Sequence, residues 1–178
     1  MIGTKELLRL VKENKLVENL CERELENPEG AGFDLRVGEV FRIKDGEAFL
    51  GETERHTPET ESIALHGKDK HVVLKPGDFV LVKTMEKVNL PNDIAAIFRP
   101  RSTLQRCGIA LFTATASPGY CGELTFGMRN LGNNELRLEM GARIAHIIFF
   151  KTSENMSAYR GQWQGGRVST EGKKETQV

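Results

Sequence analysis

The chain has 178 residues and balanced charges, with 25 lysines and arginines against 25 aspartates and glutamates. This length predicts one domain with a substantial hydrophobic core. A chain without net charge has no overall field to attract nucleic acid or a membrane surface, so we expect neither as a partner. Any anion site must therefore be local.

Three features indicate a cytoplasmic protein. No apolar run approaches the roughly 20 residues of a membrane span. The first six residues lack the apolar stretch of a secretory signal. Cys21, Cys107 and Cys121 are odd in number and widely spaced, which argues against a disulfide framework and fits a reducing compartment.

An amphipathic helix is expected first, over about residues 4–15. Leu7, Leu8 and Val11 would lie on its apolar side, and Thr4 would cap its N-terminus. After Gly30 the pattern changes to short β-rich runs punctuated by Gly, Pro and Asn. The expected strands are 33–37, 40–43, 72–74, 79–83, 95–98, 109–113, 123–128, 137–140 and 142–150. Such a series predicts a mainly β sandwich, jelly roll or barrel.

Two segments depart from this pattern. Residues 44–70 are rich in charge and poor in apolar residues, which predicts an exposed insertion or long hairpin. Residues 159–178 are polar and Gly-rich, as in a tail that is either disordered or ordered by a ligand or a neighbouring subunit. We therefore predict one β domain over 1–158 and a Gly-rich C-terminal arm over 159–178.

Two short segments combine residue types that suit a nucleotide. Arg101 and Ser102 provide a guanidinium fork and a small hydroxyl for phosphates. Tyr120, between Gly119 and Gly122, sets a flat ring beside bare backbone, as a sugar site requires. The alternative interpretations are a strand-end salt bridge and turn for the first segment and a packed turn aromatic for the second.

These segments belong to a series that resembles, in order, the five motifs of the trimeric dUTPase and dCTP deaminase superfamily. The series consists of AGFDL (31–35), PRSTL (100–104), SPGYCGE (117–123), GARIAH (141–146) and the Gly-rich tail. The tail sequence YRGQWQG (159–165) is similar to that of archaeal-type dUTPases. The resemblance implies a distorted β jelly roll, the dUTPase-like β-clip, forming a homotrimer with nucleotide sites between subunits.

The resemblance also implies how a deoxyuridine or deoxycytidine nucleotide would bind. The base would lie against hairpin backbone that includes Thr113 and Ala114, and Tyr120 would lie under the deoxyribose, leaving no room for a 2′-hydroxyl. Arg101 and Ser102 would hold the phosphates. Further contacts are implied for Thr103 beside the phosphates and for Arg160 and Gln164 in the tail.

The implied catalytic residues are Asp34, Ser117 and Arg106, with Mg²⁺ bridging phosphate oxygens through water. Asp34 matches the first-motif aspartate, which acts near the metal and its water shell, although its place in a strand also allows it to face solvent. Trp163 is either a subunit-interface anchor or a lid that stacks over the base. A zinc-dependent deaminase is not expected, because the four histidines lack ligand spacing.

The third motif departs from the family pattern. The family usually has a catalytic aspartate three residues before the aromatic, and here Ser117 stands there. Metal-free dCTP deaminases of the superfamily use a glutamate ten residues further on, where this chain has Gly127. The resemblance therefore predicts a dUTP diphosphatase, impaired if neither Asp34 nor Glu123 supplies the missing carboxylate. A dCTP deaminase and a non-catalytic deoxynucleotide-binding trimer remain as alternatives.

Overall fold

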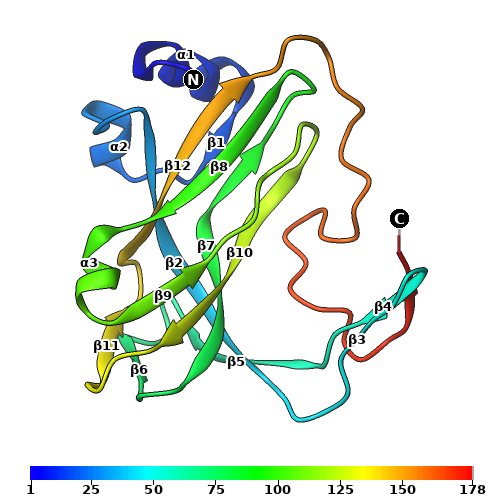
Figure 1. Ribbon diagram of the computed structural model, residues 1–178. Coiled ribbons are helices and arrows are strands. Elements are labelled where there is room, and N and C mark those ends of the chain that lie inside the picture. The colour runs from blue at the N-terminus through cyan, green and yellow to red at the C-terminus, as the bar shows by residue number, and fades with distance from the viewer. Residues whose placement is uncertain (178) are drawn as a thin grey trace.

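The computed structural model describes residues 1–177 and is mainly β, with a nearly closed, barrel-like sheet (Figure 1). Its elements in chain order are α1 (Thr4–Asn14), β1 (Val17–Glu18), α2 (Glu22–Glu26), β2 (Gly32–Ile43), β3 (Phe49–Leu50), β4 (Glu54–His56), β5 (Thr60–Leu65), β6 (His71–Leu74), β7 (Phe79–Asn89), β8 (Ile94–Pro100), α3 (Ser102–Arg106), β9 (Ile109–Phe112), β10 (Cys121–Asn130), β11 (Leu136–Glu139), β12 (Arg143–Lys151) and β13 (Glu175–Thr176). Within residues 1–177, no helix is both long and apolar enough to cross a membrane.

The main sheet has the strand order β8-β12-β2-β7-β10-β9, with β1 added to β7 and β5 added to β2. All of these pairings are antiparallel. Alternate residues of β7 and β10 are buried, which is the period-2 pattern of strands with one face on a core. Aromatic pairs fill that core, including Phe33 with Phe149 and Phe98 with Phe126, whose ring centroids are 6.2 and 5.1 Å apart.

The mainly β prediction is confirmed, and the differences are local. Residues 33–37 and 40–43 form one long strand, β2, whose pairing with β7 shifts register between Val37 and Glu39. The first helix starts at Thr4, but its N-cap is Gly3, and no side chain caps it. The hydroxyl of Thr4 instead donates to the carbonyl oxygen of Gly30 at 2.9 Å. A tertiary contact thus replaces the predicted capping bond.

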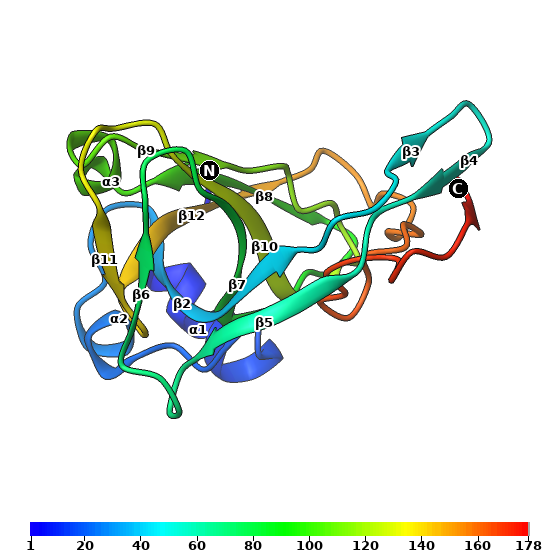
Figure 2. The same ribbon diagram turned by 90° about the horizontal axis from the view of Figure 1, so that it is seen from below.

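The predicted insertion divides into two parts. β5 joins the main sheet beside β2, whereas β3 and β4 form a hairpin that projects from one end of the molecule (Figure 2). The C-terminal residues return to this hairpin, where β13 pairs with β4. The tail therefore packs against the hairpin of its own chain. Its polar groups find partners on the hairpin, which the composition of the tail does not reveal.

Candidate functional site

A cavity of about 280 Å³ lies between the tail and the hairpin that precedes β10. Its walls come from the segment Ala114 to Ser117, from β10 between Leu124 and Phe126, and from Phe98 and Tyr120. The tail closes it with Tyr159, Trp163, Arg167 and Val168. The cavity thus contains backbone, aromatic rings and one guanidinium group, a composition suited to a planar polar ligand.

The hairpin segment is fixed by pairing with β8. Ala116 donates its N–H to the carbonyl oxygen of Ala96, and Ala96 donates in return, both at 2.9 Å. Ser117 follows directly, and its carbonyl oxygen accepts the N–H of Tyr120 at 3.1 Å, which closes a tight turn. Two of the predicted residues, Ala114 and Ser117, therefore line the cavity, and Thr113 lies exposed just before them.

Tyr120 forms a rigid wall of the same cavity. Its side chain is 8% exposed, and its hydroxyl donates to the carbonyl oxygen of Glu123 at 2.6 Å. Tyr159 packs edge-on against the ring with centroids 5.4 Å apart. Burial raises the pKa of Tyr120 to about 12, so the phenol stays protonated at neutral pH. The ring is thus held by a hydrogen bond at its hydroxyl and by an edge contact with Tyr159.

The glycines beside Tyr120 let the tail approach. A Cβ atom added at Gly122 would lie 2.3 Å from the backbone nitrogen of Gly166, and one at Gly119 would lie 2.8 Å from Cα of Ala158. Gln164 then accepts a hydrogen bond from the N–H of Cys121 and donates to the carbonyl oxygen of Gly119, each at 3.0 Å. In this structure Gln164 therefore anchors the tail to the turn, and Arg160 is exposed.

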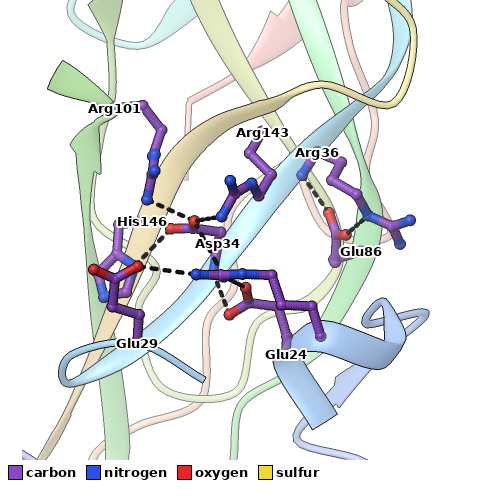
Figure 3. A network of polar contacts seen from close by, with 9 residues as sticks. Glu24, Glu29, Asp34, Arg36, Glu86, Arg101, Arg143 and His146 are labelled. Carbon is purple, nitrogen blue, oxygen red and sulfur yellow. Dashed lines mark hydrogen bonds and ion pairs between the residues drawn. The ribbon is translucent and has the colours of Figure 1, made fainter. Parts of the chain in front are cut away.

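Asp34 occupies a different place, as a buried carboxylate at the centre of an ion-pair network whose basic partners are partly exposed (Figure 3). Its Oδ2 accepts hydrogen bonds from Arg101 at 2.6 Å and Arg143 at 2.9 Å, and its Oδ1 lies 2.9 Å from Nδ1 of His146. The side chain is 1% exposed, so the alternative that Asp34 faces solvent is wrong. β2 lies between β12 and β7 in the sheet, and helix α2 also contacts Asp34, because Glu24 accepts its backbone N–H at 3.0 Å.

The network determines the charge of Asp34. Burial opposes ionisation, but the hydrogen bond with His146 and the charge of Arg101 outweigh it, so the pKa of Asp34 is lowered from its usual 3.8. A carboxylate that accepts hydrogen bonds from two guanidinium groups binds a proton weakly, because the nearby positive charges favour its ionised form. This chemistry favours a role in positioning Arg101 over the activation of water.

Three further members of this network were not predicted from the sequence, namely Arg143, His146 and Glu24. The available signal was the fourth motif, which holds both Arg143 and His146, but only strand pairing brings it to the first motif. β12 pairs with β2 so that His146 is the partner of Asp34. Glu24 resembles an ordinary surface residue of a short helix, yet it is 1% exposed.

A third buried carboxylate, Glu86, lies beside the network on β7 (Figure 3). Glu86 accepts hydrogen bonds from the backbone N–H of Arg36 at 2.8 Å and from its Nε at 2.6 Å. Burial raises the pKa of Glu86 although these bonds favour its charged form. The pair connects β2 to β7 and does not line the cavity.

The remaining predicted residues lie around α3. Arg101 precedes the helix, Ser102 and Thr103 are exposed in its first turn, and Arg106 donates to the carbonyl oxygen of Ser102 at 3.1 Å. None of these four residues lines the cavity. α3 and the tail lie on opposite sides of the molecule (Figures 1 and 2). Within one chain, the predicted phosphate residues and the predicted base and sugar residues therefore form two separate groups.

A family model described as dCTP deaminase-like matches residues 1–152. The chain belongs to this family. A dUMP-forming dCTP deaminase of Kocuria rhizophila is 32% identical over 149 residues, which cover 79% of this chain and 78% of the relative. A deoxyuridine 5′-triphosphate nucleotidohydrolase of Methanocaldococcus jannaschii is 31% identical over 149 residues, covering 83% and 92%. The resemblance to this family is thus confirmed.

Solved structures agree on the fold. The dCTP deaminase of Agrobacterium tumefaciens has a TM-score of 0.63 and 18% identity, and the match covers 83% of this chain. The match covers only 46% of the Agrobacterium chain, so the present chain aligns with less than half of that protein. The dUTPase of Staphylococcus aureus phage phi11 has a TM-score of 0.50 and 15% identity over 82% of this chain.

Within this family, Gly127 distinguishes the chain from the metal-free deaminase pattern. A Cβ atom added at Gly127 would lie 2.9 Å from Cζ of Phe79 and 3.4 Å from Cβ of Phe112. The space next to Gly127 is therefore filled by aromatic side chains. The chain therefore lacks that carboxylate, and a glutamate at this position would require the ring of Phe79 to move.

Proposed function

We propose that this protein is a dUTP diphosphatase, which hydrolyses dUTP to dUMP and pyrophosphate in pyrimidine deoxynucleotide metabolism. The observation that carries the proposal is the cavity formed by the hairpin backbone at Ala114 to Ser117 and the buried ring of Tyr120. Named relatives include both dUTP nucleotidohydrolases and dCTP deaminases. Gly127 favours the hydrolysis of dUTP over the deamination of dCTP, because hydrolysis at phosphorus needs no carboxylate at the base.

In the proposed reaction, water attacks the α-phosphorus and the bond from that phosphorus to the oxygen bridging the β-phosphate breaks. Backbone groups of the hairpin bind the base, and Tyr120 excludes a ribose 2′-hydroxyl. Arg101, held by Asp34, neutralises charge on the phosphates with Ser102, Thr103 and Arg106 beside it. Ser117 orients the attacking water but is a poor base at neutral pH, so we expect slow turnover.

We propose that the site forms between subunits of a homotrimer. The separation of the two residue groups supports this, because one nucleotide can contact both only if a second copy of the chain contributes one of them. The tail closes the base and sugar part of the site through Trp163. Sedimentation of the purified protein tests the trimer.

Mg²⁺ fits this site as an ion carried by the substrate. Within residues 1–177, no group of three or more His, Cys, Asp or Glu side chains is arranged to hold a metal, and the Asp34 oxygens are already shared with Arg101, Arg143 and His146. Mg²⁺ keeps much of its water shell and binds readily through substrate phosphates. When bound there, it would neutralise the developing charge of the leaving diphosphate.

The direct test compares product formation from dUTP and dCTP with Mg²⁺, alongside a binding titration with a non-hydrolysable dUTP analogue. Pyrophosphate released from dUTP without ammonia from dCTP supports the proposal. Ammonia release would indicate a deaminase. Tight binding of the analogue without turnover would indicate a non-catalytic nucleotide-binding protein. This outcome is tested because Ser117 stands where the family usually has a catalytic aspartate.

Arg101→Lys is expected to weaken dUTP binding by roughly tenfold, because lysine cannot reproduce a forked, charge-assisted contact with phosphate. Calorimetric titration measures the change. Arg143→Lys is the matched control, since Arg143 donates to the same Asp34 oxygen. Equal losses of dUTP affinity in the two variants would mean that disruption of the Asp34 network, and not a lost phosphate contact, weakens binding.

Tyr120 is expected to control sugar selection. The wild type should bind dUTP at least about tenfold more tightly than UTP. The 2′-hydroxyl of UTP would be buried against the ring of Tyr120 without a hydrogen-bond partner, which is costly. Tyr120→Ala should narrow this ratio, whereas Tyr120→Phe keeps the ring and loses only the bond to Glu123. Competition titrations with the two nucleotides measure the ratio, and equal binding by the wild type would refute the assignment of this turn.

A further inference from the structure

The junction between the β3–β4 hairpin and the tail is unusually rich in unpaired polar atoms. In the part of the chain that the structure describes, five buried side-chain nitrogen or oxygen atoms lack a hydrogen-bond partner. Four of them belong to this junction, namely Arg55 Nε, His56 Nδ1, Gln162 Oε1 and Glu175 Oε2. Buried polar atoms are normally paired, so four exceptions in one place distinguish this junction from the rest of the described chain.

The junction is nevertheless a specific contact. Thr57 and Thr170 exchange hydrogen bonds from each backbone N–H to the other's hydroxyl oxygen, both at 2.9 Å. Gly172 donates to the carbonyl oxygen of Thr57 at 3.0 Å, and Gln177 donates to that of Thr53 at 2.8 Å. Thr170 is fully buried. The hairpin therefore receives the tail at several defined points along its length.

Arg55 connects this junction to the cavity. On β4, its guanidinium carbon lies 5.0 Å from the ring centroid of Trp163, within the range of a cation–π contact. Trp163 lines the cavity next to Arg167, whose Nη2 lies 2.5 Å from a carboxylate oxygen of Glu175 on β13. One face of the indole is thus held by the hairpin, and the residue forms part of the cavity wall.

We propose that Arg55 is a positioning residue that holds Trp163 in the cavity wall, and that the β3–β4 hairpin is the platform on which the chain's own tail closes the cavity. The assignment of a deoxynucleotide as the ligand of the cavity rests on the proposed function. The platform does not, since it rests on contacts within the chain. Both Trp163 and the residues that bind the platform lie beyond residue 152, where the family match ends.

Trp163 is the single tryptophan of the chain, so its fluorescence reports the platform directly. The experiment uses the full-length protein without nucleotide and measures acrylamide quenching in the wild type, Arg55→Ala, Arg55→Lys and Arg42→Ala. Arg42 is the matched control, because it is 63% exposed on β2 and its nearest acidic partner, Glu61, is 3.9 Å away. The same four proteins are then assayed for kcat and KM with dUTP and Mg²⁺.

We expect Arg55→Ala to raise the quenching constant about threefold and the KM for dUTP by roughly 3- to 10-fold, with kcat nearly unchanged. Arg55→Lys should have a quenching constant and a KM between those of the wild type and Arg55→Ala, because lysine keeps the charge but not the planar stacking group. Arg42→Ala should match the wild type in both measurements. A purely structural role for Arg55 would alter stability without this combination of Trp163 exposure and KM.

Unchanged quenching in a folded Arg55→Ala protein would overturn the proposal. If that variant does not fold, Thr57→Val tests whether the hairpin holds the tail. This substitution removes the hydroxyl that accepts the N–H of Thr170 while leaving Arg55 in place. We expect increased quenching there too, and unchanged quenching would count against the platform. A wild type that fails to bind dUTP would reject the proposed function, and the quenching comparison would still judge the platform by itself.

Discussion

Ser117→Asp is expected to raise kcat for dUTP hydrolysis by about 10²–10⁴-fold, the usual contribution of a general base. Ser117 lines the cavity at the start of a turn, and the adjacent Ala116 is fixed by two hydrogen bonds to Ala96. A carboxylate introduced here would be held on rigid backbone in the place where the family usually has one. The affinity for dUTP should change little, because the base contacts water and not substrate.

Steady-state kinetics of pyrophosphate release measures this effect, and Ser117→Asn is the matched control, being similar in size to aspartate but unable to accept a proton. The kcat of the asparagine variant should be no higher than that of the wild type. Neither variant should deaminate dCTP, since Gly127 stands where the metal-free deaminases have a glutamate. A wild type that already turns over at about 1–10³ s⁻¹ would show that another residue is the base. A Ser117→Asp protein that binds dUTP yet stays inert would show that binding is the function.

Asp34→Ala should lower the free energy of unfolding by about 1.5–3 kcal/mol, because it removes charge-assisted hydrogen bonds from a buried carboxylate while the partly exposed arginines can still contact water. The substitution would leave Arg101 and Arg143 beside His146 without the carboxylate they share. Urea denaturation at fixed protein concentration measures the loss. Glu59→Ala is the matched control, since Glu59 is 57% exposed and pairs with Lys44 at 3.0 Å, and its loss should stay within about 1 kcal/mol.

The same network predicts a pH dependence. The pKa of Asp34 is lowered in the folded state, so the stability it contributes is present above its usual pKa of 3.8 and is lost as pH falls through the folded value. The difference in unfolding free energy between the wild type and Asp34→Asn should therefore be constant near neutral pH and shrink below about pH 4. A difference that persists unchanged to pH 2 would contradict an ionised Asp34 in the network.

The sequence by itself determined the family and the mainly β architecture, because both depend on local order along the chain. The motifs around Asp34, Arg101 and Tyr120 are contiguous, and the strands alternate with turn residues at short intervals. The departures at Ser117 and Gly127 were also visible from spacing alone. These features need no knowledge of which segments meet.

Only the tertiary structure decided which side chains meet, because strand pairing joins residues that are far apart in the chain. The pairing of β12 with β2 brings His146 to Asp34, and the return of the tail to β4 brings Trp163 to Arg55. It also divides the predicted site into the ion-pair network around Asp34 and a cavity on another side of the molecule. The polar composition of the tail gave no sign of this docking, since the energy of a hydrogen bond depends on a partner that composition does not identify.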